Sequence, residues 1–303
     1  MKHLTLLLAV AVGIATGAAA DESTYPEPWI TVADASTAVD PAAGMKWREA
    51  DDDVVYHQPP EGELRLYIFK PADWKPEDRR PALVSFHGGA WKTGDARAFY
   101  WQSNYFASRG MVCICPEYRI ESKHGTTPVE STRDAMRAMQ YVRAHAAELG
   151  IDPDRIAAAG GSAGGHLAAA VATVTGFEDP SEDLKNISPR PNALLLFNPV
   201  VDTTVYGFGS WWIKPNPEDL SPINQMAGEQ PPTIIFNGAL DKTTTLERAR
   251  AFAQKMNDLS NRCEVVVYPQ AEHSFFHRGK NNDYFADTLT RAKAFLESLG
   301  WIK

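Results

Sequence analysis

The stretch Gly160-Gly161-Ser162-Ala163-Gly164 decides the fold predicted for this chain. It reads G-x-S-x-G and lies between an apolar run at 156–159 and a small-residue helical pattern that begins at 165. A serine hydroxyl becomes an effective nucleophile when a sharp strand-to-helix turn holds it exposed beside a base, and such a turn requires small flanking residues. The pentapeptide therefore predicts a nucleophilic Ser162; a phosphate-binding glycine turn is the alternative interpretation.

Strand-like and helix-like stretches alternate along the chain after residue 60. Continuous apolar runs, typical of strands covered on both faces, predict strands at 63–69, 82–86, 112–118, 155–159, 193–199, 233–237 and 264–268. Helical periodicity predicts helices at 98–108, 130–149, 165–174, 245–259 and 284–299. The alternation indicates an α/β fold in which helices flank a mostly parallel sheet.

Two segments interrupt this alternation. Residues 21–60 are rich in proline and acidic residues and have little periodicity, and residues 203–232 have a loop-like composition. Neither segment is a linker that would divide the chain, and 303 residues with 44% hydrophobic composition suit one large domain. We therefore expect a single domain over 21–303, with an insertion at about 203–232.

The first twenty residues have the features of a secretory signal peptide. Lys2 gives a positive start, an apolar stretch follows at 4–16, and Ala18-Ala19-Ala20 supplies a small-residue cleavage site. An apolar stretch of about 13 residues is too short to span a bilayer, so an uncleaved anchor is the weaker alternative. We expect a secreted or periplasmic protein with no membrane association after cleavage.

Charge and cysteine content limit the partners and cofactors. The net charge of −8 argues against nucleic acid and anionic membrane surfaces as partners, because both require a basic face. Cys113, Cys115 and Cys263 do not form a disulfide framework and are interpreted as buried small hydrophobic residues, with a bridge to Cys263 as the alternative. The chain has no C-x-x-C motif, and we expect neither a metal nor a cofactor.

A second glycine-rich stretch, His87-Gly88-Gly89-Ala90-Trp91, directly follows the strand predicted at 82–86. Acyl transfer places negative charge on the carbonyl oxygen of the substrate, and each backbone N–H directed at that oxygen stabilises it by about 3 kcal/mol. Gly89 and Ala90, together with Ala163, are the expected donors of this oxyanion hole. His87 is interpreted as a brace for the loop.

An acid and a base are expected after the last two strands. Asp241 follows the strand at 233–237, where its carboxylate can orient an imidazole or cap the next helix; Asp202, after the preceding strand, is the rival acid. His273 follows the final strand, and His277 is the alternative base. The chain order Ser162, Asp241, His273 is the serine–acid–histidine order of α/β-hydrolases.

Four aromatic residues are candidates for substrate contact. Trp91, Tyr118, Trp211 and Trp212 are predicted to wall a pocket or to stack on a sugar or phenolic ring. Ordinary packing of the 203–232 insertion on the domain is the alternative interpretation. Export together with these aromatic residues favours short acyl groups on carbohydrate or aryl alcohols.

The chain resembles the α/β-hydrolase superfamily over nearly all of its mature length. The stretches His87–Trp91 and Gly161–Ala168 are similar to those of secreted bacterial esterases related to hormone-sensitive lipase, in the branch of acetylxylan and feruloyl esterases. The resemblance implies an eight-stranded sheet and hydrolysis of carboxylic esters without metal or cofactor. It also differs from the hormone-sensitive lipase pattern at two positions: Ala90 stands where that pattern has a third glycine, and Gly161 where it favours an acidic residue.

The resemblance implies the roles of the site residues. Ser162 corresponds to the nucleophile, Asp241 to the acid and His273 to the base, and Gly89, Ala90 and Ala163 to the oxyanion donors. The predicted function is that of a secreted serine carboxylesterase acting on small-molecule or carbohydrate esters with short acyl groups, acetyl and feruloyl among them. A secreted serine peptidase or amidase of the same fold and a catalytically inactive binding protein are the alternatives.

Overall fold

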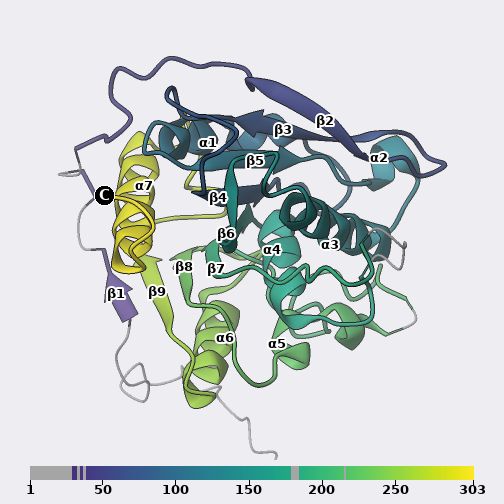
Figure 1. The fold of residues 1–303 in the computed structure, drawn as a ribbon. Coiled ribbons are helices and arrows are strands. Elements are labelled where there is room, and N and C mark those ends of the chain that lie inside the picture. Colours follow the sequence, from purple (N-terminus) through teal and green to yellow (C-terminus); the bar gives the residue numbers. More distant parts are fainter. Residues whose placement is uncertain (1–28, 33–34, 37–38, 179–183, 215) are drawn as a thin grey trace, which may run out of the picture.

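A computed structural model describes residues 29–32, 35–36, 39–178, 184–214 and 216–303, so the expected signal peptide at 1–20 lies outside the described residues. One sheet of nine strands, in the order β1-β9-β8-β7-β6-β4-β5-β3-β2, runs through the domain (Figure 1). The strands are β1 (Trp29–Thr31), β2 (Asp52–His57), β3 (Leu64–Phe69), β4 (Arg80–Phe86), β5 (Val112–Pro116), β6 (Ile151–Gly161), β7 (Ala193–Phe197), β8 (Thr233–Gly238) and β9 (Cys263–Tyr268).

The sheet is mostly parallel, as predicted. All neighbouring strands from β1 across to β5 pair in parallel, whereas β3 pairs antiparallel with both β5 and β2. The expected number of eight strands is wrong by one, because the short β1 adds a parallel edge strand beside β9. Both β1 and β2 fall in the segment 21–60, where edge strands with exposed residues leave no continuous apolar run in the sequence.

Helices cover both faces of the sheet. They are α1 (Tyr100–Ala107), α2 (Glu121–His124), α3 (Pro128–Ala144), α4 (Ala163–Thr173), α5 (Pro222–Gln225), α6 (Leu246–Asp258) and α7 (Asn282–Ser298), with short 3₁₀ helices η2 (Ala96–Phe99) and η3 (Pro217–Leu220). Buried residues of α3, α4 and α6 form one core cluster with the sheet, and those of α1 and α7 form the other. The result is a three-layer α/β/α domain (Figure 1).

The residues of the central strands alternate between these two clusters. In β4, Ala82, Val84 and Phe86 belong to the cluster with α3 and α4, while Leu83 belongs to the one with α1 and α7. Successive side chains of a strand point to opposite faces, and both faces of this sheet are covered. The central strands are therefore apolar at nearly every position, which is why the sequence shows them as continuous runs.

The helix predicted at 130–149 begins earlier and ends sooner. Thr127 caps α3 in a reciprocal capping box with Glu130, and Pro128 occupies the first turn, so the helix begins at residue 128. It ends at Ala144, and turns continue to Gly150, where φ is +65°. The apolar periodicity identified the helix, but the capping residues set its first residue.

The segment predicted as an insertion, 203–232, is described except for residue 215 and consists of turns with the two short helices η3 and α5. Ile223 N donates to Val201 O at 2.9 Å, which joins the segment to the loop after β7, and within the segment the Thr203 hydroxyl donates to Pro217 O at 2.6 Å. The segment therefore packs over the same end of the sheet as the loops that carry the predicted site residues.

Two further expectations concern cysteines and membranes. Cys113, Cys115 and Cys263 are all buried and unbridged, as predicted, and burial raises the pKa of each thiol. Among the described residues, no helix combines the length and the apolar character needed to cross a membrane.

Candidate active site

Ser162 lies at the turn between β6 and α4. Its backbone has φ 55° and ψ −119°, a conformation that non-glycine residues rarely adopt and that marks strained turns at functional sites. The flanking glycines are required by close approach: a Cβ at Gly160 would lie 2.2 Å from Gly164 O, and one at Gly164 would lie 2.0 Å from Phe86 O. The small residues of the pentapeptide thus allow the strand, the turn and the helix to meet.

The residue before the nucleophile has a specific neighbour. A Cβ at Gly161 would lie 2.4 Å from the ring carbon Cζ of Phe276, so the aromatic ring occupies the space that a side chain at 161 would need. Phe276 is itself buried and comes from the loop after β9. This packing accounts for glycine at a position where the resemblance leads one to expect an acidic residue.

The structure brings Ser162, His273 and Asp241 into one row. His273 Nε2 is 2.9 Å from Ser162 Oγ, and His273 Nδ1 is 2.7 Å from Asp241 Oδ2. The Asp241 carboxylate accepts a hydrogen bond from His273 Nδ1–H, and in that tautomer Nε2 presents its lone pair to the serine hydroxyl. A base that is hydrogen-bonded to a nucleophile and oriented by a third group is the arrangement of a nucleophilic triad.

Backbone hydrogen bonds between loops hold these residues together. In the loop after β8, Ala239 N donates to Tyr268 O at 2.9 Å and Leu240 N donates to Ala271 O at 3.0 Å, which ties this loop to the one after β9. Ser162 N donates to Phe197 O at 3.0 Å, which ties the nucleophile turn to the end of β7. Because β6, β7, β8 and β9 are parallel neighbours, their carboxyl ends bring the three loops to one edge of the sheet.

Asp241 is buried and fully hydrogen-bonded. Its carboxylate accepts hydrogen bonds from Thr243 N at 2.8 Å, from Thr244 N at 2.9 Å and from the Thr244 hydroxyl at 2.8 Å, in addition to His273. Burial by itself raises the pKa of this carboxyl, but the hydrogen bonds from His273 and Thr244 outweigh burial, and the pKa lies below its usual value. Asp241 is therefore ionised at neutral pH and able to stabilise a charged imidazole.

The rival acid, Asp202, has different partners. Its carboxylate accepts hydrogen bonds from Thr204 N at 2.8 Å and the Thr204 hydroxyl at 2.7 Å, and it lies 3.5 Å from the Arg248 guanidinium. The geometry therefore favours Asp241 over Asp202 as the partner of His273.

The alternative base, His277, lies at the same cavity without a hydrogen bond to the serine. Its ring packs on Phe276 at a centroid distance of 4.2 Å and on Phe99 at 6.3 Å. Burial, with smaller contributions from Lys280 and His273, lowers the pKa of His277 to about 4, so this imidazole is neutral at pH 7.

No group of three or more potential metal ligands is present among the residues that the structure describes.

The loop expected to form the oxyanion hole lies against the nucleophile. A Cβ at Gly88 would be 3.0 Å from Gly161 O and 3.4 Å from Ser162 Cβ. Gly89 and Ala90 both have positive φ, 122° and 55°, and the conformation of Ala90 explains why a glycine is favoured there in related sequences. Ala163 begins α4, where helix N–H groups have no acceptor within the helix.

His87 braces this loop, as predicted. Its ring stacks on Tyr118 at 4.2 Å, its Nδ1 lies 2.7 Å from Gly88 O, and the Tyr118 hydroxyl donates to His87 O at 2.8 Å. Burial lowers the pKa of His87 to about 4, so the ring is neutral at pH 7.

A cavity of about 510 Å³ contains the serine and the histidine. It is lined by Gly88, Gly89, Ala90, Lys92, Thr93, Ala98, Gly161, Ser162, Phe208, Thr243, His273, Ser274, Phe276 and His277. This volume suits a small ligand.

None of the four aromatic residues predicted to contact substrate lines this cavity, so their contact with substrate stays a prediction. Trp91 and Tyr118 are buried in the core, where Trp91 packs on His166 and Tyr118 on His87. Trp211 and Trp212 stand behind the lining residues: Trp211 contacts the Phe208 ring at 5.1 Å, and Trp212 lies under the Lys92 ammonium at 5.1 Å.

Several residues of the site were not predicted. Thr244 holds Asp241, and Phe208 and Phe276 supply the aromatic wall. The run Asp241-Lys242-Thr243-Thr244 has the polar composition of a helix start, so Thr244 could have been identified from the sequence. Phe208 carried no comparable signal, because its place at the cavity depends on how the insertion folds back.

Several solved structures similar to this chain are of one esterase. The apo form of Thermogutta terrifontis esterase 2 aligns with a TM-score of 0.81 and 41% identity over 85% of this chain and 97% of that chain. The same esterase with butyrate bound aligns with a TM-score of 0.79 and 41% identity over 83% of this chain and 95% of that one. It has also been solved with propionate bound and after phosphorylation by paraoxon.

Curated proteins similar to this chain are also esterases. A probable carboxylic ester hydrolase, LipM, from Mycobacterium tuberculosis is 29% identical over 69% of this chain and 53% of its own length. An acetylxylan esterase from Xylanibacter ruminicola is 24% identical over 71% of this chain and 44% of its own length. The chain thus spans about half the length of these curated relatives.

Two family models match successive parts of the chain. The BD-FAE model matches residues 66–208, and the model of the dienelactone hydrolase family matches residues 194–303. The match to Thermogutta terrifontis esterase 2 extends over nearly all of that protein, at an identity well above the level at which only the fold is shared. With this likeness and the mostly parallel sheet described above, the chain belongs to the carboxylesterases of the α/β-hydrolase family.

Proposed function

We propose that this protein is a serine carboxylesterase that hydrolyses short-acyl esters through an acyl-enzyme on Ser162. The observation that carries the proposal is the hydrogen-bonded row from Ser162 Oγ through His273 to Asp241 at the cavity wall. A neutral imidazole with an ionised partner can take the serine proton as the hydroxyl attacks, and the carboxylate stabilises the imidazolium that forms.

The mechanism follows from these positions. Ser162 Oγ attacks the ester carbonyl while His273 Nε2 takes its proton. The N–H groups of Gly89, Ala90 and Ala163 are the proposed donors to the oxyanion. As the tetrahedral intermediate collapses, the alcohol leaves with the proton from His273, and water then repeats the sequence on the acyl-enzyme to release the acid.

The size of the cavity supports short acyl groups. Its wall combines the glycine-rich loop with Phe208 and Phe276, a lining suited to a small apolar acyl chain. Butyrate and propionate are bound in structures of Thermogutta terrifontis esterase 2, and we extend this preference to the present chain. Acetyl groups on carbohydrate are the proposed natural esters, which the similarity to an acetylxylan esterase supports, and feruloyl groups are the larger alternative.

We also propose that the protein acts outside the cytoplasm, in the periplasm or after secretion. The support is the pattern of residues 1–20 in the sequence. Mass spectrometry of the mature protein tests it: the N-terminus is expected at Asp21, and a protein that keeps Met1 would contradict it.

Replacement of the nucleophile tests the activity. Ser162→Ala is expected to lower kcat on p-nitrophenyl acetate by about 10⁵-fold or more while thermal unfolding is little changed. Paraoxon is expected to add one phosphoryl adduct to the native protein and none to the variant. An undiminished turnover in Ser162→Ala would refute the proposal. Acetyl, butyryl, octanoyl and feruloyl esters and acetylated xylan, assayed side by side, then rank the acyl groups.

A further inference from the structure

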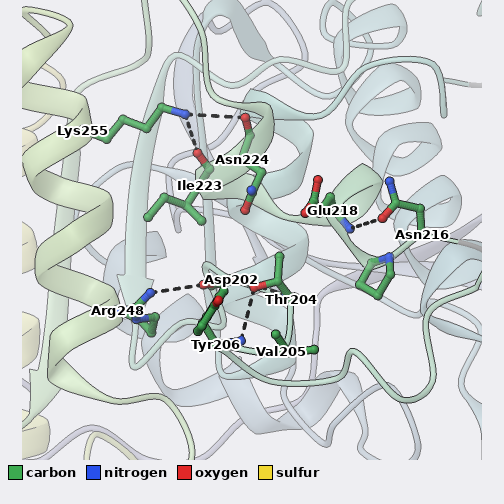
Figure 2. A pocket seen from close by; sticks show the side chains of 11 residues that line it. Asp202, Thr204, Val205, Tyr206, Asn216, Glu218, Ile223, Asn224, Arg248 and Lys255 are labelled. Carbon is green, nitrogen blue, oxygen red and sulfur yellow. Dashed lines mark hydrogen bonds and ion pairs between the residues drawn. The ribbon is translucent and has the colours of Figure 1, made fainter.

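A second cavity, of about 480 Å³, lies beside the start of α6 (Figure 2). Figure 2 shows Asp202, Arg248 and Tyr206 along one side of it and Lys255 and Asn224 on the opposite side. The cavity shares no lining residue with the one that contains Ser162. It is a separate hollow on the same edge of the domain, between the loop after β7, η3, α5 and α6.

The polar lining of this cavity is balanced in charge. It contains two carboxylates, Asp202 and Glu218, and two cations, Arg248 and Lys255. The cations are already engaged: Arg248 faces Asp202 at 3.5 Å, and the Lys255 ammonium donates to Ile223 O at 2.7 Å. The charges of the lining sum to zero, so its net charge attracts neither an anion nor a cation, whereas its carboxylate, guanidinium and amide groups can exchange hydrogen bonds with a neutral hydroxylated ligand.

Exposed apolar side chains are concentrated in the loop that borders the cavity. Val205 is 79% exposed, Tyr206 78% and Trp211 63%. Val205 and Tyr206 line the second cavity, and Trp211 packs on Phe208 at the rim of the first. Large apolar side chains grouped in one exposed segment are typical of a binding surface, and a tyrosine ring also offers a flat face for stacking.

The loop also fixes where these side chains stand. Phe208 N donates to Asp202 O at 2.9 Å and Gly207 N donates to Thr204 O at 3.1 Å, which closes a tight turn. A Cβ at Gly207 would lie 1.9 Å from Asp202 O, so only glycine permits this closure. Phe208 and Tyr206 are two residues apart, so their Cα atoms lie within about 7 Å of each other. The turn at 205–208 therefore contributes Phe208 to the lining of the first cavity and Tyr206 to the lining of the second.

We infer that the second cavity and the exposed side chains of 205–211 form an accessory site for the alcohol part of the ester, and that this part is a neutral oligosaccharide. The inference rests on the proposed function for the statement that an ester is bound with its carbonyl at Ser162. The sugar chain extends from the catalytic cavity across the turn at 205–208, stacks on Tyr206 and exchanges hydrogen bonds with Asn224 and Arg248.

Binding of unesterified oligosaccharides tests the site independently of catalysis. Calorimetric titration of the full-length protein with xylotetraose and cellotetraose is expected to show binding, and Tyr206→Ala is expected to weaken it by about fivefold or more, as truncation of an aromatic anchor does. Tetragalacturonate, which is anionic, is expected to bind more weakly than the neutral sugars. Absence of binding, binding unaffected by Tyr206→Ala, or tighter binding of the anion would each overturn the inference.

Kinetics separate a failure of this inference from a failure of the proposed function. The ratio of kcat/KM for an acetylated xylo-oligosaccharide to that for p-nitrophenyl acetate is expected to fall about fivefold or more in Tyr206→Ala, mainly through KM. Trp47→Ala is the matched control, an exposed aromatic residue that stacks on Tyr100 outside both cavities. Equal ratios in all three proteins would overturn the accessory site, while a wild type without turnover of p-nitrophenyl acetate would overturn the esterase assignment instead.

Discussion

Two buried aspartates follow neighbouring parallel strands, Asp202 after β7 and Asp241 after β8, and each is 4% exposed. Each also accepts hydrogen bonds from the backbone and hydroxyl of a following threonine, Thr204 and Thr244 respectively. They differ in the group that reaches them from another element, which is the His273 imidazole for Asp241 and the Arg248 guanidinium for Asp202.

The difference shows what a local pattern can and cannot assign. A carboxylate after a strand, followed by threonine, predicts a buried and ordered aspartate in both loops. The partner distinguishes the two loops: Asp241 contacts an imidazole that lies next to a serine, which supports its proposed role in the reaction, whereas Asp202 contacts a guanidinium on α6 and holds a turn. Three comparisons of variants sharpen or break this contrast, and a fourth prediction concerns the dependence of stability on pH.

The largest effect is expected at Asp241. Asp241→Asn keeps the shape of the side chain but donates to His273 Nδ1, or forces the other tautomer, so kcat on p-nitrophenyl acetate is expected to fall by about 10⁴-fold. Asp202→Asn is expected to retain kcat within about tenfold, since it has no contact with the imidazole. Initial-rate kinetics on both variants check this, and equal or reversed losses would abolish the distinction between the two loops.

The threonines should separate in the same way. Thr244→Val removes one hydrogen bond to an ionised carboxylate, and hydrogen bonds of this kind contribute about 1.5–3 kcal/mol. Because part of this stabilisation is expected to be lost from the transition state, kcat is expected to fall by about tenfold. Thr204→Val is the matched control, expected to leave kcat unchanged. A comparable loss of kcat in both valine variants would show that the Thr244 hydroxyl has no greater effect on catalysis than the Thr204 hydroxyl.

A change in stability is expected where activity is retained. Asp202→Ala leaves the Thr204 N–H without its acceptor and leaves Arg248 with only Glu247 as a carboxylate partner, so the free energy of unfolding is expected to fall by about 1–3 kcal/mol. Urea unfolding followed by circular dichroism measures this, with Asp73→Ala as the control, because the side chain of Asp73 is 81% exposed. An unchanged unfolding midpoint in Asp202→Ala would mean that the turn at 202–208 does not depend on this carboxylate.

The smallest effect concerns pH and His166, which joins α4 to the insertion. Its Nε2 donates to Leu220 O at 2.8 Å, its Nδ1 is buried without a partner among the described residues, and burial lowers its pKa to about 4. Below about pH 6.5, the usual pKa of histidine, His166 binds a proton in the unfolded chain but stays neutral in the folded chain. The free energy of unfolding is therefore expected to fall as the pH drops from about 6.5 to about 4.

In His166→Gln, the free energy of unfolding is expected to depend less steeply on pH. The slope decreases by up to the amount that about one titrating proton contributes. His87 and His277, whose pKa values burial also lowers to about 4, retain the rest of the slope. Asp241 acts in the same sense but at lower pH: because its folded-state pKa is lowered, its contribution to stability is present above the unfolded value and is lost as the pH falls below that value. Urea titrations at pH 7 and pH 5 compare the two proteins, and identical slopes would exclude His166 as a contributor.

The features that could be predicted from the sequence are those with strict backbone requirements. The nucleophile turn needs glycine on both sides of Ser162, and buried parallel strands need apolar residues at every position, so both leave continuous signatures. Ser162, Asp241 and His273 each follow a predicted parallel strand, which placed them on loops at one sheet edge, and the fold brings them within hydrogen-bond distance.

The features that could not be predicted depend on contacts between distant segments. Nothing in the sequence distinguishes Trp91 from Trp211, yet Trp91 is fully buried and Trp211 is mostly exposed. The burial of each ring is set by the segments that pack on it. The edge strand β1 is only three residues long and two of its residues are exposed, so no continuous apolar pattern identifies it. Phe208 reaches the cavity only through the turn that Gly207 closes.

The positive φ of Ser162 has a consequence for the durability of the protein. Glycine adopts this backbone region without penalty, so a chain with glycine at 162 would be expected to resist denaturation better than the native one, while lacking any nucleophile. Turnover and robustness thus demand different residues at a single position. The native sequence gives up part of the stability its fold could reach in order to keep a hydroxyl there.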